Sequence, residues 1–345
     1  MERELERYSR QILFSGVGED GQRKLCASRV LLVGCGALGS NIANTMVRAG
    51  VGKITIVDRD FIEMHNLQRQ TLFDEEDVAR SLPKSIAAAE KLRRINSQVD
   101  IVPLVTDVNP GNIEQLVGGA DIVLDGTDNF ETRYLINDAC IKLGKPWVYG
   151  GVVTSGGTTM TIIPHETACL RCVFPECPPS GSTATADTAG ILASVVSVIA
   201  SLECAEAIKL LVGAREQVNK GMTWVDVWDN SFLQVSTGGP AANCLTCAKG
   251  EYQFLIGSAA DTTRCGRQSI QFTPTAPTSL SFPEMAARIG AEAEVHFNEY
   301  MLRLLVGECE VIVFRDGRTM VKGTSDEDVA RGLYRRYVSM ERDAL

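Results

Sequence analysis

The residues best suited to bind a ligand begin with a glycine-rich turn. A run of four aliphatic residues leads into Gly34-x-Gly36-x-x-Gly39, and a helix-forming segment follows it. Glycines let a backbone turn sharply and approach a ligand closely, while the first turn of a helix offers free N–H groups to phosphate. Because the same motif also occurs in purely structural turns, it predicts a phosphate site only if other residues support it.

Charged residues supply that support. Asp58 and Asp60 end a second predicted strand about 20 residues after the glycines, where a dinucleotide-binding unit places a carboxylate on the ribose. Lys84 lies in the first turn of a predicted helix, where a cation is disfavoured unless an anion meets it. With Asp125 and Asp128 at the end of another strand, several carboxylates converge, which predicts a magnesium ion carried by nucleotide phosphates. Lys84 as a surface charge and Asp128 as a helix cap are the alternatives.

Two cysteine pairs have the spacing of metal ligands. Cys169-x-x-Cys172 and Cys244-x-x-Cys247 match the pairs that hold one tetrahedral zinc ion. Four thiolates leave no open coordination position, so the zinc is expected to be structural and to join two distant segments. A redox role for either pair is the alternative. The chain has eleven cysteines and no secretion signal, which argues against a disulfide framework.

Composition narrows the possible partners and compartment. With 345 residues, 45% of them apolar, the chain can bury a large core. A net charge of -9 and a pI near 5.1 argue against nucleic-acid or anionic-membrane partners. The first residues are charged, and the longest apolar stretch, 189–202, is too short to span a bilayer. We therefore expect a cytoplasmic protein.

Strands and helices alternate through the first two thirds of the chain. This pattern predicts an α/β fold with a doubly wound, Rossmann-like, mostly parallel sheet, whose ligands lie at the carboxyl ends of the strands. A small-residue crossover loop over 178–190, a buried helix over 191–212 and a strand over 224–228 are expected next. The remainder predicts a small α+β module, with strand 265–272, helix 281–289, a hairpin from 310 to 323 and helix 326–337. The expected domains are 1–260, with the ligand site, crossover loop and zinc site, and 261–345.

Taken together and in order, these motifs resemble the ThiF/MoeB/HesA family, bacterial relatives of ubiquitin-activating enzymes. The similarity covers about residues 5 to 250 and rests on the following segments: Arg7-Tyr8-Ser9-Arg10-Gln11, the turn from Gly34 to Gly39, Asp58-x-Asp60, Asn66-Leu67-Gln68-Arg69-Gln70, Pro83-Lys84, Thr127-Asp128-Asn129 and both cysteine pairs.

The resemblance implies an ATP-dependent adenylyltransferase. Such enzymes bind ATP with Mg²⁺ and adenylate the Gly-Gly carboxylate of a small β-grasp sulfur carrier of the ThiS or MoaD type, releasing pyrophosphate. The resemblance implies nucleotide contacts at the three glycines and Asp58, with Asp60 on the ribose, Asn66, Arg69 and Lys84 on the phosphates, Asp128 on magnesium, and Arg10 on ATP of the other subunit of a homodimer. Because no sulfurtransferase domain is evident, a separate sulfur donor is implied.

One position departs from the family pattern. Many relatives carry Thr-Cys-Asp-Thr-Ala-Gly in the crossover loop, and that cysteine bonds covalently to the activated carrier. This chain has Ala186 at the cysteine position, and alanine cannot act as a nucleophile. We expect adenylation without a covalent bond at residue 186, whether the alanine is natural or replaces a cysteine.

Two other functions fit part of this pattern. An NAD-dependent oxidoreductase would use the glycine turn and the acidic strand end, but Arg69, Lys84 and Asp128 suit a triphosphate with a metal, and no hydride-transfer site is evident. A non-catalytic adaptor could use the same fold to bind a carrier protein. Within the favoured class, the sequence leaves open thiamine, molybdopterin, tRNA-thiolation and other carriers.

Overall fold

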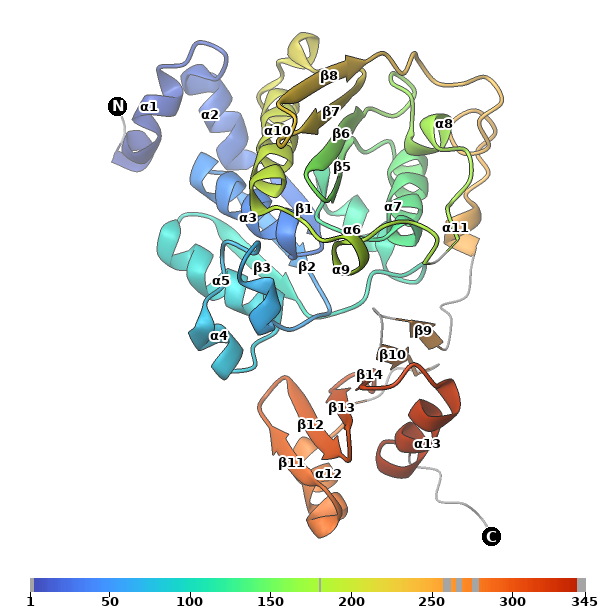
Figure 1. Ribbon diagram of the computed structural model, residues 1–345. Helices are drawn as coiled ribbons and strands as arrows, with labels where there is room; N and C mark the ends of the chain where they lie inside the picture. Colours follow the sequence, from blue (N-terminus) through green and yellow to red (C-terminus); the bar gives the residue numbers. More distant parts are fainter. Residues whose placement is uncertain (1–2, 180, 257–261, 265–268, 275–278, 340–345) are drawn as a thin grey trace. The chain divides into compact units, whose positions relative to one another are not determined.

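The computed structural model describes residues 3–179, 181–256, 262–264, 269–274 and 279–339. Contacts within the chain divide it into two compact units, Met1–Gly257 and Ser258–Leu345. The first unit contains every residue of the predicted nucleotide and zinc sites (Figure 1).

An eight-stranded sheet forms the centre of the first unit, in the order β3-β2-β1-β4-β5-β6-β7-β8. Neighbours from β3 to β5 pair in parallel, and β6 to β8 continue the sheet antiparallel. The strands are β1 (Arg29–Val33), β2 (Lys53–Val57), β3 (Asp100–Leu104), β4 (Ile122–Asp125), β5 (Trp147–Val153), β6 (Gly156–Ile162), β7 (Met222–Asp226) and β8 (Ser231–Val235). The chain order reverses between β1 and β4, and a doubly wound sheet binds its ligand at that switch point. The predicted fold class is confirmed.

Helices cover both faces of this sheet, as Figure 1 shows. Helices α3, α5 and α10 pack together on one face, while α6 and α7 lie on the other. The helical segments are η1 (Arg3–Tyr8), α1 (Ser9–Ile12), α2 (Gly18–Ala27), α3 (Ala37–Ala49), η2 (Met64–Asn66), α4 (Glu75–Ala79), α5 (Lys84–Ile95), α6 (Ile113–Gly118), α7 (Phe130–Leu143), α8 (Leu170–Val173), α9 (Ala186–Ala189), α10 (Ala193–Val212), η3 (Arg215–Gln217) and α11 (Gln253–Ile256).

Several expected elements differ from those in the structure: the helix expected over 191–212 begins at Ala193, and two further differences have a local cause. The strand expected over 224–228 is β7, which ends at Asp226 because that carboxylate accepts the backbone N–H groups of Trp228 (2.9 Å) and Asp229 (3.2 Å) and turns the chain. The expected crossover loop contains one helical turn, α9, whose N-cap Thr185 forms a capping box with Thr188.

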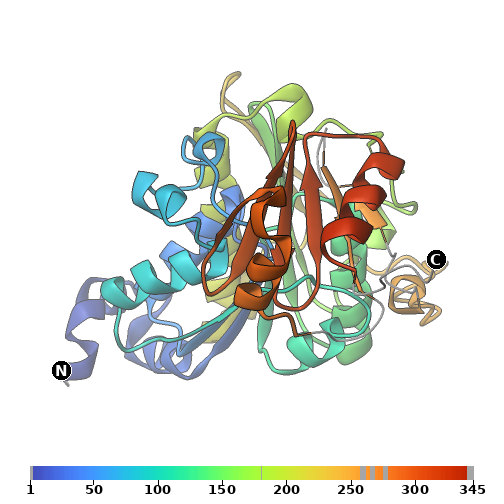
Figure 2. The same ribbon diagram turned by 90° about the horizontal axis from the view of Figure 1, so that it is seen from below.

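The second unit is a six-stranded antiparallel sheet in the order β11-β12-β13-β14-β10-β9. Helices α12 (Phe282–Ile289) and α13 (Glu327–Tyr337) lie on the same face of that sheet (Figure 2) and enclose a separate hydrophobic core. Its other elements are β9 (Thr262–Arg264), β10 (Ser269–Phe272), η4 (Gly290–Glu292), β11 (Glu294–Phe297), β12 (Met301–Val306), β13 (Cys309–Phe314) and β14 (Thr319–Lys322). Of the strand expected over 265–272, residues 265–268, including Cys265, lie outside the described residues.

Among the residues that the structure describes, no helix combines the length and apolarity needed to cross a membrane.

Candidate functional site

The glycine turn is packed so closely that side chains are excluded from most of it. A Cβ atom on Gly39 would lie 2.1 Å from the carbonyl oxygen of Gly34, and one on Gly126 would lie 2.3 Å from the same oxygen. Gly34 itself has φ of +87°, in the left-handed region that favours glycine. A Cβ on Gly36 would meet only the side-chain amide of Gln70, at 3.8 Å. Gly36 is therefore on the open side of the turn, where a ligand can approach the backbone.

Asp58, the residue after β2, fixes the backbone of this turn by a hydrogen bond. Its buried carboxylate accepts the backbone N–H of Cys35 at 2.6 Å and that of Asp60 at 2.7 Å. Burial raises the pKa of Asp58, and the Lys84 ammonium opposes that rise. Asp60 is more exposed than Asp58, and its carboxylate lies 3.1 Å from Nζ of Lys84 and 3.8 Å from Nε of Arg59.

Lys84 is a buried cation at the first position of α5. Its Nζ lies 3.1 Å from Oδ2 of Asp60, and its backbone N–H donates to the carbonyl of Asp60 at 2.8 Å. Burial alone would lower the pKa of Lys84, but the carboxylates of Asp60 and Asp58 outweigh it and raise the pKa. Lys84 therefore stays charged at the rim of the sheet. Because it is buried, the alternative interpretation of Lys84 as a surface charge is wrong.

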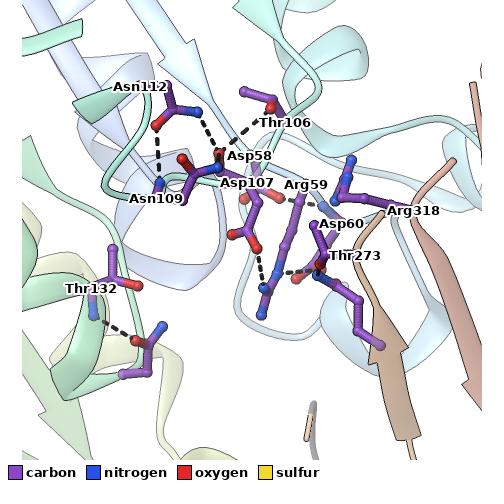
Figure 3. Close-up of polar contacts among 12 residues, drawn as sticks. Asp58, Arg59, Asp60, Thr106, Asp107, Asn109, Asn112, Thr132, Thr273 and Arg318 are labelled. Atoms are coloured by element: carbon purple, nitrogen blue, oxygen red, sulfur yellow. Dashed lines mark hydrogen bonds and ion pairs between the residues drawn. The ribbon is translucent and has the colours of Figure 1, made fainter. Parts of the chain in front are cut away.

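An ion pair that the sequence analysis missed joins the ends of β2 and β3. Arg59 Nη1 lies 3.0 Å from Oδ2 of Asp107, and the Asn112 side chain donates to the carbonyl of Asp107 at 2.7 Å (Figure 3). Arg59 lies between two predicted ligand residues, and nothing in the local pattern distinguished it from a solvated charge. The pair holds the loop after β3 beside Asp60.

The end of β4 is organised around a second missed ion pair. Asp125 is fully buried and accepts the N–H (2.9 Å) and hydroxyl (2.6 Å) of Thr127 and Nε of Arg133 (2.9 Å). Nη2 of Arg133 donates to the carbonyls of Thr127 and Gly150, both at 2.8 Å. Because Asp125 is neutralised by this buried arginine, it is not one of the free carboxylates on which the magnesium prediction rested.

Asp128 is the exposed carboxylate at this rim. The helix cap of α7 is Asn129, whose side chain accepts the N–H of Thr132 at 2.9 Å, so the interpretation of Asp128 as that cap is wrong. The Asp128 carboxylate also helps to raise the pKa of Lys84, although it ranks below Asp60 and Asp58 in that effect. The charges of Asp128 and Lys84 therefore interact at this rim.

The polar segment after β2 is more buried than a solvated loop. Asn66 is buried and its side chain accepts the N–H of Glu63 at 3.1 Å, while Gln70 is buried beside the glycine turn. Arg69 is half-buried and donates to the carbonyl of His65 at 2.9 Å. Arg10 is exposed on α1, and its predicted reach into a second subunit stays a prediction.

The four predicted zinc ligands meet in space. The Sγ atoms of Cys169, Cys172, Cys244 and Cys247 all lie within 4.8 Å of one another, with three neighbouring pairs 3.3 to 3.7 Å apart. Zinc–sulfur bonds of about 2.3 Å in a tetrahedron require sulfur atoms about 3.8 Å apart. A hydrogen bond from Cys169 lowers the pKa of Cys172 to about 4, whereas the same contact raises the pKa of Cys169, and burial with neighbouring thiols raises that of Cys247. The cluster therefore fits one tetrahedral zinc ion.

Helix α7 holds both arms of this cluster. Its Asn137 side chain accepts the N–H of Leu170 at 3.0 Å, and its buried Asp138 accepts the Thr246 hydroxyl at 2.9 Å and the N–H of Phe254 at 3.0 Å. Since α7 begins just after Asp128, the helix connects the cysteine cluster to the predicted nucleotide rim.

Ala186 begins the short helix α9. The end of this helix is attached to the turn between β5 and β6, because Thr154 donates its N–H to Gly190 (3.0 Å) and accepts that of Leu192 (2.8 Å). Position 186 therefore lies in a helical turn, and its side chain has no thiol.

Comparisons with known proteins place the chain in a family. The ThiF family pattern matches residues 8–246. The sulfur carrier protein ThiS adenylyltransferase of Bacillus subtilis is 39% identical over 336 residues, which cover 96% of this chain and 99% of that protein. The SAMP-activating enzyme E1 of Haloferax volcanii is 36% identical over 247 residues, covering 72% of this chain and 90% of that protein.

Solved structures share the fold of the first unit. The crystal structure of Escherichia coli MccB with ATP has a TM-score of 0.62 and 23% identity, covering 71% of this chain and 75% of MccB. The family pattern covers more than two thirds of the residues, including the glycine turn, both acidic strand ends and three of the four cysteines, and it ends one residue before Cys247. The chain therefore belongs to the ThiF family.

Proposed function

We propose that this protein uses ATP to adenylate the C-terminal Gly-Gly carboxylate of a small β-grasp sulfur carrier, releasing pyrophosphate. The observation that carries the proposal is the 39% identity to a ThiS adenylyltransferase along 99% of that protein's length. The rim of the sheet supports it, because an exposed carboxylate at Asp128 and a charged, buried Lys84 suit a triphosphate with a metal better than a nicotinamide.

The proposed reaction needs charge stabilisation rather than a general base. The carrier's terminal carboxylate is already ionised at neutral pH, and its attack on the α-phosphate builds negative charge on the phosphate oxygens. We assign Lys84, Arg69, Asn66 and a second subunit's Arg10 to the phosphates, the glycine turn to close backbone contact and Asp60 to the ribose. Positioned cations of this kind stabilise a transition state because their charges need no reorganisation.

Two metals belong to the proposal. Asp128 would hold Mg²⁺, which supplies additional positive charge at the phosphates. The four cysteines would hold a structural zinc that joins α8 and its N-cap to the loop after β8. We propose further that the enzyme works in the cytoplasm as a homodimer with a separate sulfur donor, that residues 1–260 perform the chemistry, and that residues 261–345 are an accessory module.

ATP–pyrophosphate exchange tests the proposal. The purified chain is incubated with Mg²⁺, ATP and labelled pyrophosphate, alone and with each of several β-grasp proteins that end in Gly-Gly. Exchange that requires one carrier is expected, and that carrier names the pathway. The matched control is the same carrier with its C-terminus amidated, which removes the nucleophile. Protein that binds ATP with Mg²⁺ but supports no exchange with any carrier would favour the adaptor function instead.

A further inference from the structure

Glu203 on α10 is the most anomalous buried group in the first unit. Glu203 is fully buried, and neither of its carboxylate oxygens has a hydrogen-bond partner within the described residues. A carboxylate buried without hydrogen bonds or a paired cation is very costly, whereas its protonated form costs much less. The chain must therefore gain something from this position or keep the group neutral.

The carboxyl group of Glu203 lies directly against the backbone of β5. A Cβ atom on Gly150 would lie 2.0 Å from Oε1 of Glu203, so only glycine leaves room for it. Thr159 pairs with Gly150 across the β5–β6 ladder, which directs its side chain to the same face of the sheet. The hydroxyl of Thr159 is also buried without a partner. Glu203 thus faces a polar spot in the middle of β5.

Gly150 connects this spot to the predicted nucleotide rim. Its carbonyl accepts Nη2 of Arg133, and the same nitrogen donates to the carbonyl of Thr127, the residue before Asp128. Arg133 is also the buried partner of Asp125. One guanidinium therefore sets the positions of β5, of Asp125 and of the backbone that carries Asp128.

We propose that Glu203 is a positioning residue that carries a proton in the folded enzyme, and that this neutral carboxyl keeps Arg133 on Asp125, Thr127 and Gly150. If Glu203 releases its proton to solvent, a second buried negative charge stands near Asp125 and competes for the same guanidinium. Arg133 would then hold the Asp128 backbone less firmly, and binding of ATP with Mg²⁺ would weaken. This inference rests on the proposed function for its ligand but not for the proton on Glu203.

The charges around Glu203 agree with a neutral group. Burial raises the pKa of Glu203 well above its ordinary value, Asp125 on β4 raises it further, and Arg133 on α7 opposes both. Among the elements packed against α10, β6 carries no titratable side chain and β5 carries only Tyr149. The other titratable or charged groups on these elements are Glu19, Asp20, Arg23, Lys24 and Cys26 on α2, Arg48 on α3, Arg215 and Glu216 on η3 and Asp226 on β7; α10 itself adds Cys204, Glu206 and Lys209.

The test compares wild type with Glu203→Gln, which imitates the protonated carboxyl, and with Glu216→Gln, which removes one exposed carboxylate on η3, beyond the end of α10. The first readout is urea unfolding without nucleotide, at several values between about pH 5 and pH 9. A raised pKa means that the folded chain retains a proton that the unfolded chain releases above about pH 4.3. Wild type and Glu216→Gln should therefore lose stability as the pH rises, and Glu203→Gln should lose less.

The second readout is calorimetric binding of ATP with Mg²⁺ over the same pH range. Wild type and Glu216→Gln should bind about tenfold more weakly at the alkaline end, relative to Glu203→Gln, which is the effect of losing one well-placed hydrogen bond. Identical pH profiles of binding in all three proteins would overturn the positioning role, and identical unfolding profiles would overturn the proton on Glu203. Folded wild type that binds no ATP at any pH would refute the proposed function instead, and the unfolding profiles would still decide the protonation.

Discussion

Replacing Arg133 and, in a second variant, Arg29 compares the loss of a buried ion pair with the loss of an exposed one in the same protein. Arg133 and Asp125 are joined at 2.9 Å with side chains 7% and 0% exposed, whereas Arg29 and Asp121 are joined at 2.8 Å with side chains 52% and 36% exposed. The two pairs have the same chemistry and nearly the same length. They differ in their access to water, so the two substitutions measure the effect of burial.

Arg133→Gln should destabilise the first unit strongly. It removes the donor of three hydrogen bonds and leaves the Asp125 carboxylate buried without a cation. Breaking a buried pair in this way costs about 3–5 kcal/mol of unfolding free energy. Arg29→Gln should have little effect, because water already solvates that exposed pair. Arg133→Lys keeps the charge but not the planar fork of donors, so its loss of unfolding free energy should lie between those of Arg133→Gln and Arg29→Gln.

Tryptophan fluorescence during urea unfolding is a suitable assay. The three tryptophans, Trp147, Trp224 and Trp228, all lie in the first unit, so the signal reports on that unit alone. When the same fluorescence is followed during heating, the thermal midpoint should fall by about 2–4 °C for each kcal/mol of unfolding free energy that is lost. An Arg133→Gln protein as stable as Arg29→Gln would refute the conclusion that Arg133 neutralises Asp125 and organises the end of β4.

Three further predictions concern the nucleotide and metal sites. Lys84→Met should lower the ATP–pyrophosphate exchange rate by roughly 10²–10³-fold, as expected for a lost charge-stabilising donor. Lys84→Arg should retain more activity, because it keeps the positive charge. A Met variant as fast as wild type would contradict the assignment of Lys84 to the phosphates. Gly39→Ala should weaken ATP binding measured by calorimetry, because its Cβ would lie 2.1 Å from the Gly34 oxygen, whereas Gly118→Ala, whose Cβ meets nothing within 4 Å, should bind normally. Cys172→Ser should lose bound zinc by elemental analysis and melt at a lower temperature, while Cys26→Ser, outside the cluster, should do neither; a metal-free wild-type protein of full stability would argue against a structural zinc.

Features with a local sequence signal could be predicted. The glycine turn follows the continuous apolar run of β1, as expected for a parallel strand that is buried on both faces, and Asp58 and Asp60 follow the mostly apolar β2. The cysteine pairs were found from their spacing alone, although 75 residues separate Cys169 from Cys244, whose sulfur atoms lie 3.6 Å apart. In each case the chemistry requires a short pattern, and the pattern is visible along the chain.

Features made by tertiary contact could not be predicted in the same way. Arg133 is one of several charged residues on α7, and only the fold brings its guanidinium to Asp125 and Gly150. The carboxyl of Glu203 is buried because α10 packs against β5, which no pattern within the helix reveals. The sequence therefore predicted a group of equivalent carboxylates at the rim, whereas burial divides them into a neutralised Asp125, a bracing Asp58 and the more accessible Asp60 and Asp128.

The most direct test of the central claim is the intact mass of the carrier itself. The carrier that supports exchange is incubated with the enzyme, ATP, Mg²⁺ and pyrophosphatase, and its mass is measured without reducing agent. We expect a gain of one adenylyl group on the carrier, absent when its C-terminus is amidated, and no covalent enzyme–carrier species. An unmodified carrier, or a carrier bonded covalently to a cysteine of this chain, would contradict it.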